Sequence, residues 1–280
     1  MPIIVEKLTH AYLHSGDYKA VSDISLTIRE GEFLGIIGQT GSGKSTFIQH
    51  LNGLMQPTEG KVYVDGFDMS DKKQRREGRK LVGMVFQYPE YQLFEETVQK
   101  DVAFGCLNMG MSESEALARA DEAMSLVGLS PEKFGEKSPF ELSGGEKRRA
   151  ALAGIISMRP KYLIMDEPMA GLDPLGRKDI MDTIDSLRRE LGCAVVMVSH
   201  SMDDVALRSE RIAVLSEGRL IREGDKREIF SDVELLLKNG LDIPQVTRLA
   251  LALKKRGVNM PDGILDMDGF VKAIKERLAQ

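Results

Sequence analysis

The sequence Gly38-Gln39-Thr40-Gly41-Ser42-Gly43-Lys44-Ser45, with Thr46 behind it, fits the pattern G-x-x-x-x-G-K-[ST]. This pattern is typical of a loop that wraps the phosphates of a nucleotide. The apolar run 33–37 in front of the loop predicts a buried strand, and residues 45–54 behind it predict a helix with apolar side chains at helical spacing. Strand, loop and helix in this order predict a site for a nucleoside triphosphate.

The residue types in this loop suit phosphate chemistry. Glycines let the backbone turn tightly and point successive N–H groups inward, which makes a concave anion site. The helix behind the loop adds partial positive charge at its N-terminus. Lys44 can reach the β- and γ-phosphates, and the hydroxyl of Ser45 can ligate Mg2+. We therefore expect a nucleoside triphosphate together with Mg2+ at this loop.

The composition is ordinary for a globular protein, with 29% charged and 42% hydrophobic residues. The 280 residues can bury a substantial core in one large domain or two. A net charge of −5 argues against a nucleic-acid scaffold, which would usually show a basic face. We expect the basic run 72–76 on a solvated loop rather than on DNA.

Cysteine usage and apolar runs indicate the compartment. Cys106 and Cys193 have neither C-x-x-C nor metal-binding spacing, so we expect two reduced thiols in a cytosolic protein. The first residues do not resemble a signal peptide. The longest apolar runs, such as 193–198, have about six residues, against the ~20 needed to span a bilayer. If the protein works at a membrane, a partner must supply the membrane-spanning part.

From residue 88 to about residue 154 the pattern becomes helical and predicts a helical insert in an otherwise α/β domain. Within this insert, Leu142-Ser143-Gly144-Gly145-Glu146 leads into a further helix. Ser143 and Glu146 have capping-box spacing, so the segment could be no more than a well-capped helix. The two glycines argue for more, because glycine is costly inside a helix and leaves N–H groups open to a second anion.

Two further strands end in candidate catalytic residues. The apolar strand that begins at residue 162 ends in Asp166 and Glu167. A carboxylate beside a phosphate loop suits Mg2+ coordination, usually through water, and the next acid can deprotonate the attacking water. Alone, such a pair is as often a turn or a helix cap. The strand 193–198 leads to His200, at the edge where ligands bind in open α/β sheets, although a surface or capping histidine is the alternative.

The two ends of the chain carry weaker signals. Tyr12 precedes the phosphate loop and could stack on adenine, although an isolated tyrosine is as often ordinary core or surface. Beyond residue 224 the composition becomes helical again. We expect residues 226–280 to form a small helical appendage without catalytic residues.

Together these motifs resemble those of the ATP-binding cassette (ABC) ATPases, over roughly residues 3–225. The matches follow in chain order: Walker A at 38–45, the Q-loop at Gln87, the signature at 142–146, Walker B at 162–167, the D-loop at 170–173 and the switch histidine at His200. The resemblance implies a P-loop, RecA-like α/β core with an antiparallel β region, within an ATPase domain at 1–225. Tyr12 lies where this family has its adenine-stacking aromatic residue.

The resemblance implies ATP as the nucleotide and assigns roles to the motif residues. It implies that Lys44, Glu167 and His200 are catalytic, and that Ser45, Gln87 and Asp166 ligate Mg2+. In this family two cassettes pack head to tail. The remaining nucleotide contacts would therefore come from the loop, from Tyr12 and, across the dimer, from Ser143, Gly144, Gly145 and Asp173.

In such a dimer ATP binding would bring the two cassettes together and hydrolysis would separate them. Two positions depart from the common pattern: Glu146 stands where the signature usually has Gln, and Met169 replaces the usual Thr or Ser. These departures leave open whether both composite sites hydrolyse ATP equally.

The stretch 85–105 is similar to the ATPases of energy-coupling factor (ECF) transporters, which import vitamins and transition metals. The tail around 240–247 is similar to one of that family's two paralogous ATPase types. The resemblance implies a peripheral subunit at the cytoplasmic face of the cell membrane, paired with a paralogue or with a second copy, with residues 226–280 assisting dimerisation. Its further partners would be a transmembrane coupling subunit that docks near Glu90–Asp101 and, indirectly, a substrate-binding membrane subunit.

Three rival functions are weighed against this one. The ATPase of another ABC importer is disfavoured by the stretch 88–105. An ABC protein of nucleic-acid repair or translation would need long coiled-coil insertions or two fused cassettes, so we expect no nucleic-acid partner. A P-loop kinase of small molecules would need neither the signature nor the switch histidine. The sequence does not identify the transported substrate.

Overall fold

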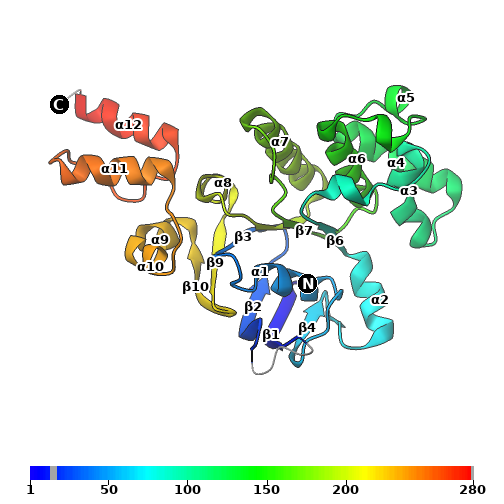
Figure 1. The fold of residues 1–280 in the computed structure, drawn as a ribbon, viewed down its shortest axis with the longest axis horizontal. Helices are drawn as coiled ribbons and strands as arrows, with labels where there is room; N and C mark the ends of the chain where they lie inside the picture. The colour runs from blue at the N-terminus through cyan, green and yellow to red at the C-terminus, as the bar shows by residue number, and fades with distance from the viewer. Residues whose placement is uncertain (13–17, 279–280) are drawn as a thin grey trace.

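The structure, a computed structural model, describes residues 1–12 and 18–278. Two β-sheets lie at its centre, and helices cover them on the side opposite the antiparallel strands and at both ends (Figure 1). The larger sheet has the strand order β10-β9-β3-β8-β7-β6. Its strands are β3 (Phe33–Gly38), β6 (Val82–Val85), β7 (Tyr162–Asp166), β8 (Ala194–Val198), β9 (Arg211–Ser216) and β10 (Arg219–Asp225).

The five strands from β9 to β6 run parallel, and β10 pairs with β9 antiparallel in a hairpin that turns at Gly218. Every residue of β3, β7 and β8 is buried, which explains their uninterrupted apolar sequences. Parallel strands end at one edge of the sheet. The phosphate loop after β3, Glu167 after β7 and His200 after β8 are therefore brought to the same edge.

The smaller sheet is antiparallel, with the order β2-β1-β4-β5. Its strands are β1 (Ile3–His10), β2 (Val21–Ile28), β4 (Glu59–Val64) and β5 (Phe67–Asp68). In β2 buried and solvent-facing residues alternate over most of the strand, as expected for a strand with one face on the core. One apolar cluster joins this sheet to the parallel sheet and to helix α1.

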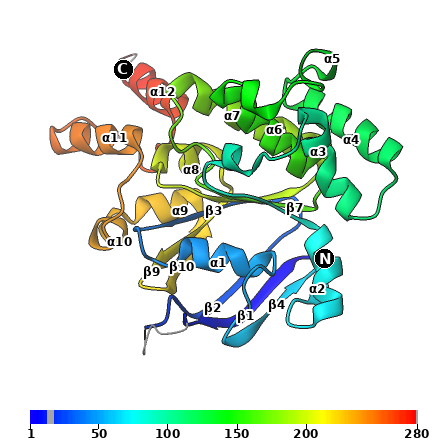
Figure 2. The same ribbon diagram turned by 45° about the vertical axis from the view of Figure 1, so that its right-hand side comes forward.

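Helices α3 to α6 form the insert, and α1, α2, α7 and α8 follow strands of the two sheets (Figure 2). Their bounds are α1 (Lys44–Leu51), α2 (Lys72–Lys80), α3 (Val98–Asn108), α4 (Glu113–Leu126), α5 (Pro131–Phe134), α6 (Gly144–Ile156), α7 (Pro174–Leu191) and α8 (Met202–Arg208), with 3-10 turns η1 (Pro89–Gln92) and η2 (Pro139–Glu141). α1 begins one residue earlier than predicted, because its N-cap is Gly43, and it ends three residues earlier, with Asn52 as its C-cap.

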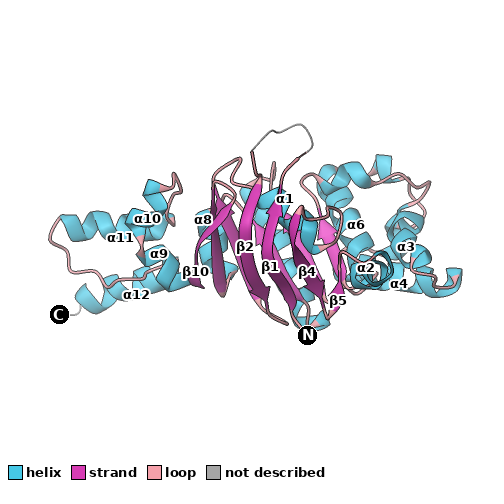
Figure 3. Cartoon of the chain, turned by 90° about the horizontal axis from the view of Figure 1, so that it is seen from below, coloured by secondary structure: helices cyan, strands magenta, loops and turns pink. Residues whose placement is uncertain are grey.

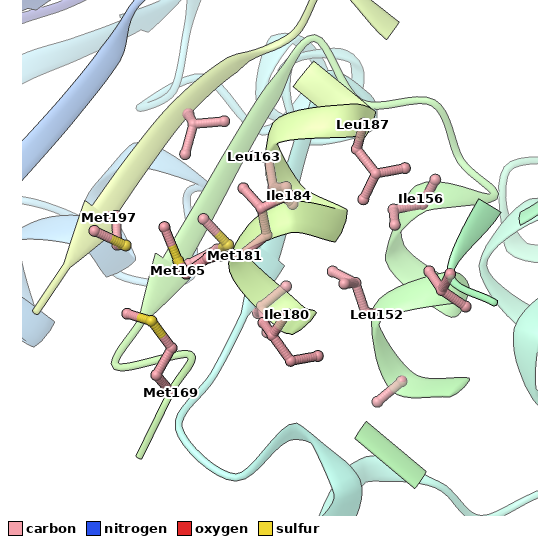
Figure 4. Close-up of a cluster of buried hydrophobic side chains, with 14 of the residues drawn as sticks. Leu152, Ile156, Leu163, Met165, Met169, Ile180, Met181, Ile184, Leu187 and Met197 are labelled. Carbon is pink, nitrogen blue, oxygen red and sulfur yellow. The ribbon is translucent and has the colours of Figure 1, made fainter. Parts of the chain in front are cut away.

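A second and larger apolar cluster lies between the parallel sheet and the helices. Figure 4 shows Ile180, Ile184 and Leu187 of α7 between the strands and α6. Leu152 and Ile156 of α6 face them from the insert. The insert therefore packs onto the ATPase core through α7 rather than forming an independent unit.

The expectation for the basic run 72–76 is wrong: it forms the helix α2 and not a loop. The side chain of Asp71 accepts hydrogen bonds from the backbone N–H groups of Lys73 and Gln74, which caps the helix. Lysine and arginine are good helix formers, and Arg79 and Lys80 lie in the last turn, where positive charge suits the helix dipole. Local capping and dipole effects thus outweigh the mutual repulsion of the charges.

The C-terminal segment contains α9 (Lys226–Ser231), α10 (Val233–Lys238), α11 (Gln245–Lys255) and α12 (Met267–Leu278). Phe230 and Leu236 of α9 and α10 belong to the main apolar cluster. α11 and α12 project away from the sheets (Figure 3) and bury a small cluster of their own around Ala250, Met260 and Ile264. Within the described residues, no helix is both long and apolar enough to span a membrane.

Candidate active site

The side chain of Lys44 holds the phosphate loop together through hydrogen bonds to its backbone. Its Nζ donates to the carbonyl oxygens of Gly38 and Gln39, at 2.7 and 2.8 Å. Gly43 has φ +92°, and a Cβ there would lie 2.3 Å from the carbonyl oxygen of Ala20. Only glycine fits at such a position, so the backbone can turn its N–H groups into the site. Burial lowers the pKa of Lys44, and the carboxylates of Glu167 and Asp166 oppose that shift.

Asp166, the last residue of β7, lies beside the loop. Burial raises the pKa of this carboxyl group, and a hydrogen bond from the side chain of Ser45 and the charge of Lys44 counteract the shift. The hydroxyl of Ser45 and the carboxylate of Asp166 are thus in contact across the site. Both are oxygen ligands of the kind that Mg2+ prefers.

Glu167 occupies a strained and buried position directly after β7. Burial raises the pKa of its carboxyl group to about 7. Its φ is +49°, a conformation that non-glycine residues adopt rarely and mostly where the surrounding structure enforces it. Here the backbone N–H of Glu167 donates to the carbonyl oxygen of Val198 in β8, which fixes the turn. A carboxylate with a pKa near 7 is well suited to act as a general base.

His200 approaches Glu167 from the end of β8. Its Nε2 lies 3.4 Å from Oε1 of Glu167. That oxygen is buried and accepts no hydrogen bond from any residue that the structure describes. Burial lowers the pKa of His200, as does the charge of Lys44. The carboxyl group of Glu167 therefore keeps an acceptor oxygen that is open to a further hydrogen-bond donor.

A cavity of about 600 Å³ brings most of the predicted site residues together. From the predicted set, its lining contains Tyr12, Thr40, Gly41, Gly43, Lys44, Ser45, Thr46, Gln87, Asp166, Glu167 and His200. The hydroxyl of Tyr12 lies 2.9 Å from Oγ1 of Thr46. An aromatic ring, a cationic loop and acidic groups in one cavity fit a purine nucleotide with its phosphates, so the residues present suit ATP.

Three loop residues that were predicted to contact the nucleotide, Gly38, Gln39 and Ser42, do not line the cavity. Gly38 and Gln39 act through their carbonyl oxygens, which hold Lys44. The side chain of Gln39 points toward Gly240, where an added Cβ would meet its amide nitrogen. Ser42 is buried, and its hydroxyl has no hydrogen-bond partner among the described residues.

The signature residues Ser143, Gly144 and Gly145 are exposed and do not line the cavity. Ser143 caps α6: its Oγ donates to Oε2 of Glu146 at 2.7 Å and accepts from the N–H of Glu146. The N–H of Ser143 donates to the same carboxylate at 2.8 Å. Asp173 also lies outside the cavity and caps α7 through the N–H of Gly176. Within one chain, these residues are separate from the nucleotide site.

The two departures from the family pattern have structural explanations. Glu146 completes the capping box of α6, and its hydrogen bonds with Ser143 lower the pKa of its carboxyl group. Met169 is buried in the main apolar cluster below the site (Figure 4).

Sequence analysis missed two residues near the site. Tyr18 lines the cavity as a second aromatic residue. Arg148 is buried in α6, and its guanidinium donates to both carboxylate oxygens of Glu90 at 2.9 and 3.1 Å. It also donates to the carbonyl oxygens of Pro168 and Ala170. The spacing of Arg148 from Leu152 and Ile156, four and eight residues, places it on the apolar stripe of α6 and could have revealed its burial.

Comparisons with known proteins identify the family of this chain. A family model described as "ABC transporter" matches residues 21–170. The "Energy-coupling factor transporter ATP-binding protein EcfA2" of Clostridium perfringens is 49% identical over 279 residues, which are 99% of this chain and 98% of that protein. The chain belongs to the ABC transporter family, among the ECF transporter ATP-binding proteins. The EcfA2 protein of Caldanaerobacter subterraneus is 51% identical over 96% of this chain. The chain is accordingly an ATP hydrolase of the transport-coupled class.

Solved structures of ABC cassettes share the fold. The structure of cbiO1 from Clostridium perfringens, described as part of the ABC transporter complex cbiONQ, has a TM-score of 0.73 and 37% identity, and covers 88% of this chain and 97% of its own. The cassette MJ0796, solved as a dimer with ADP and phosphate after hydrolysis, has a TM-score of 0.71 and 31% identity, over 80% of this chain and 98% of its own. The predicted ABC ATPase fold is confirmed.

Proposed function

We propose that this chain energises an ECF-type importer of vitamins or transition-metal ions from the cytoplasmic face of the cell membrane. The observation that carries the proposal is the cavity in which the phosphate loop, Asp166, Glu167 and His200 meet, in a chain whose relatives are named as ECF ATP-binding proteins. The transported substrate would be chosen by a separate membrane subunit.

In this proposal each residue of the cavity has a separate role in ATP hydrolysis. Lys44 offsets the charge of the β- and γ-phosphates, and Glu167 accepts a proton from the attacking water. His200 contacts the γ-phosphate, and Tyr12 stacks on the adenine. Ser45, Gln87 and Asp166 are the residues that would hold Mg2+, which when bound neutralises charge that develops on the transferred phosphoryl group.

The second half of the site would come from another cassette. The signature residues Ser143, Gly144 and Gly145 are exposed at the N-terminus of α6, outside their own cavity. Free N–H groups at a helix N-terminus bind anions, so we infer that they meet the γ-phosphate held by a partner cassette. Asp173 would join the same interface. ATP binding then closes the dimer, and hydrolysis reopens it.

We infer that the partner cassette is a paralogue, because of the tail around residues 240–247, although a homodimer would use the same contacts. Residues 226–280 would assist dimerisation. Leu249 of α11 and Met267 and Val271 of α12 leave apolar side chains exposed on this appendage. Exposed apolar groups of this kind commonly mark protein–protein contacts.

The segment Glu90–Asp101 would dock the transmembrane coupling subunit, close to Gln87 and therefore to the nucleotide. Three of its acids already have partners within the chain, and one of these pairs, Glu96 with Lys100 at 2.9 Å, lies on the surface. Glu90 pairs with Arg148, and Oδ2 of Asp101 accepts from the N–H groups of Phe94 and Glu95, at 2.7 and 2.8 Å. These two acids therefore shape the segment. Glu95 and Glu96 are the acids that would meet arginines of the partner.

Co-purification tests this function. The chain is co-expressed with the ECF coupling subunit and the second ATPase encoded in its own genome, and membranes are extracted in mild detergent. We expect all three proteins to elute together and to hydrolyse ATP. Recovery of the chain only with the permease of a different ABC importer, or with nucleic acid, would contradict the assignment.

A further inference from the structure

Two histidines lie beside Tyr12, although neither of them lines the nucleotide cavity. His10 is in β1 and His50 is in α1, 40 residues apart in the sequence. The ring of His10 meets the ring of Tyr12 edge to face, with centroids 4.9 Å apart, and its centroid lies 4.7 Å from that of His50. His50 is only 1% exposed. The proposed chemistry does not use this buried imidazole, so its polar contacts need another explanation.

The hydrogen bonds of the two histidines determine which ring nitrogens carry protons. Nδ1 of His50 lies 2.8 Å from the carbonyl oxygen of Thr46, which can only accept, so this nitrogen carries the proton. Burial lowers the pKa of His50 to about 4, which keeps its imidazole neutral at pH 7 and leaves Nε2 as an acceptor. Nδ1 of His10 lies 3.2 Å from this Nε2 and 3.1 Å from the carbonyl oxygen of Gln56, and therefore donates to both.

These contacts form a closed circuit between Tyr12 and the helix that follows the phosphate loop. The hydroxyl of Tyr12 lies 2.9 Å from Oγ1 of Thr46, and the carbonyl oxygen of Thr46 accepts from His50. His50 in turn accepts from His10, and the ring of His10 packs against the ring of Tyr12. Thr46 lies in the first turn of α1, directly after Ser45. Both ends of the tyrosine side chain are therefore connected to α1.

Tyr12 needs this support because it lies at the edge of the fold. It follows the end of β1 by two residues and is 44% exposed. An exposed aromatic side chain loses conformational entropy when a ligand fixes its orientation. A ring that is already held in the bound orientation avoids part of this loss, so preorganisation raises affinity without any new contact to the ligand.

We propose that His10 and His50 are positioning residues that hold the ring of Tyr12 in the orientation required to stack on the adenine of ATP. This inference rests on the proposed function, in which Tyr12 stacks on the base. The expected effect is on the affinity for the base and not on the phosphoryl chemistry. A merely structural pair, which only joins β1 to α1, would instead affect the binding of every ligand of the cavity alike.

Calorimetric titration of the full chain with two ligands separates these roles. ATP with Mg2+ carries both the base and the phosphates, whereas tripolyphosphate with Mg2+ carries the phosphates alone. We expect His10→Ala to weaken ATP binding about three- to tenfold, the range for the loss of one aromatic contact, and to leave tripolyphosphate binding unchanged. Equal weakening for both ligands would overturn the inference. Tyr63→Ala removes a ring from β4 of the same sheet, away from the cavity lining, and as the matched control should change neither affinity.

A double-mutant cycle shows whether His10 acts through Tyr12. In a chain that already carries Tyr12→Ala, the further change His10→Ala should cause no additional loss of ATP affinity. An additional loss as large as in the unchanged chain would mean that His10 acts independently of the tyrosine, and the positioning role would be wrong.

His50 is tested by two variants, because a buried residue is sensitive to substitution. His50→Gln keeps an acceptor for the Nδ1–H group of His10, whereas His50→Leu removes the acceptor and keeps an apolar side chain in the core. We expect only His50→Leu to weaken ATP binding selectively over tripolyphosphate. Equal ATP affinities in the two variants would contradict the role of His50. If His50→Leu does not fold by circular dichroism, the cycle at His10 decides the proposal.

Tyr12→Ala alone separates a failure of this inference from a failure of the proposed function. If Tyr12→Ala weakens ATP binding and His10→Ala does not, stacking on adenine stands and the positioning role is wrong. If Tyr12→Ala leaves ATP binding unchanged, the proposed stacking is wrong and the inference is overturned with it.

Discussion

The nucleotide cavity and the signature end of α6 both present backbone N–H groups to an anion, yet they differ in almost every physical respect. The cavity is buried, holds Lys44 and Glu167 with shifted pKa values, and includes a strained φ at Glu167. The signature end is exposed and carries an ordinary capping box. In the proposed dimer, the chemistry would therefore reside in the cavity of one cassette, whereas the signature end of the other would supply only contacts.

Glu167→Gln, a change within the nucleotide cavity, should have the largest effect on ATP hydrolysis. The change keeps the shape of the side chain and removes the base, a contribution typically worth about 10²–10⁴ in rate. We expect kcat to fall by that factor in a complex whose sites all carry the change. ATP should still bind, and the closed dimer should accumulate in size-exclusion chromatography. Near-normal turnover would show that another group activates the water.

Arg148→Ala should remove the contacts between α6, which begins at the signature, and the residues that follow Glu167. The guanidinium joins Glu90 to the carbonyl oxygens of Pro168 and Ala170, and the side chain is only 5% exposed. Removal of one partner of a buried pair costs about 3–5 kcal/mol. We expect urea denaturation to report a loss of that size in the free energy of unfolding.

The control for Arg148 is Arg159→Ala. Arg159 also makes a two-oxygen contact, with Glu122, but both side chains are 49% exposed. Exposed pairs contribute about 0–1 kcal/mol. Equal destabilisation by the two variants would mean that the Arg148 contacts are no stronger than a surface ion pair.

The pH dependence of turnover should follow the deprotonation of the buried Glu167. The pKa of Glu167 is raised to about 7, and the base acts only when deprotonated. We therefore expect kcat/KM of the assembled ATPase to fall about tenfold per pH unit below that value. Burial lowers the pKa of His200 in the same site. A profile that stays flat from pH 8 to pH 5 would contradict the assignment.

The same shift has a consequence for stability with a definite sign. The folded-state pKa of Glu167 lies above the unfolded value of about 4.3. Its stabilising effect is therefore complete below that unfolded pKa and is lost as the pH rises through about 7. Glu167→Gln should make the free energy of unfolding of the isolated chain less dependent on pH across this range.

The smallest expected effect is the change in stability and ATP hydrolysis when the capping boxes of α4 and α6 are altered. Ser143 caps α6 and Ser112 caps α4 with the same arrangement of serine and glutamate. Ser143→Ala and Ser112→Ala should each cost about 1 kcal/mol of stability. Only Ser143→Ala should reduce ATP hydrolysis by the assembled dimer. If both variants hydrolyse ATP normally, the hydroxyl of Ser143 is a cap and nothing more.

Much of the fold could be predicted because it is encoded locally. The apolar runs of β3, β7 and β8 and the glycine spacing of the phosphate loop lie within short segments. The order of parallel strands then brought Asp166, Glu167 and His200 to one edge. The dimer half of the site remains a proposal from family resemblance, because no hydrogen bond among the described residues connects Ser143 to the loop.

The remaining features depend on contacts between distant segments. Glu90 and Arg148 are 58 residues apart in the sequence, so their pairing leaves no local pattern. The basic run 72–76 was wrongly placed on a loop, although Asp71 in front of it was an N-cap signal that could have been used. The pairing of His10 with His50 depends on the contact between β1 and α1, which periodicity does not reveal.

The small cluster beneath α11 and α12 implies that the chain does not open as one unit. Three buried residues, Ala250, Met260 and Ile264, hold these helices together, whereas the β3 and β8 strands are enclosed by the two large clusters. Regions with few buried apolar contacts open with a lower free energy than the core. Amide protons of α11 and α12 should therefore exchange with solvent while the sheet stays protected, and the tail can unfold and refold without disturbing a bound nucleotide.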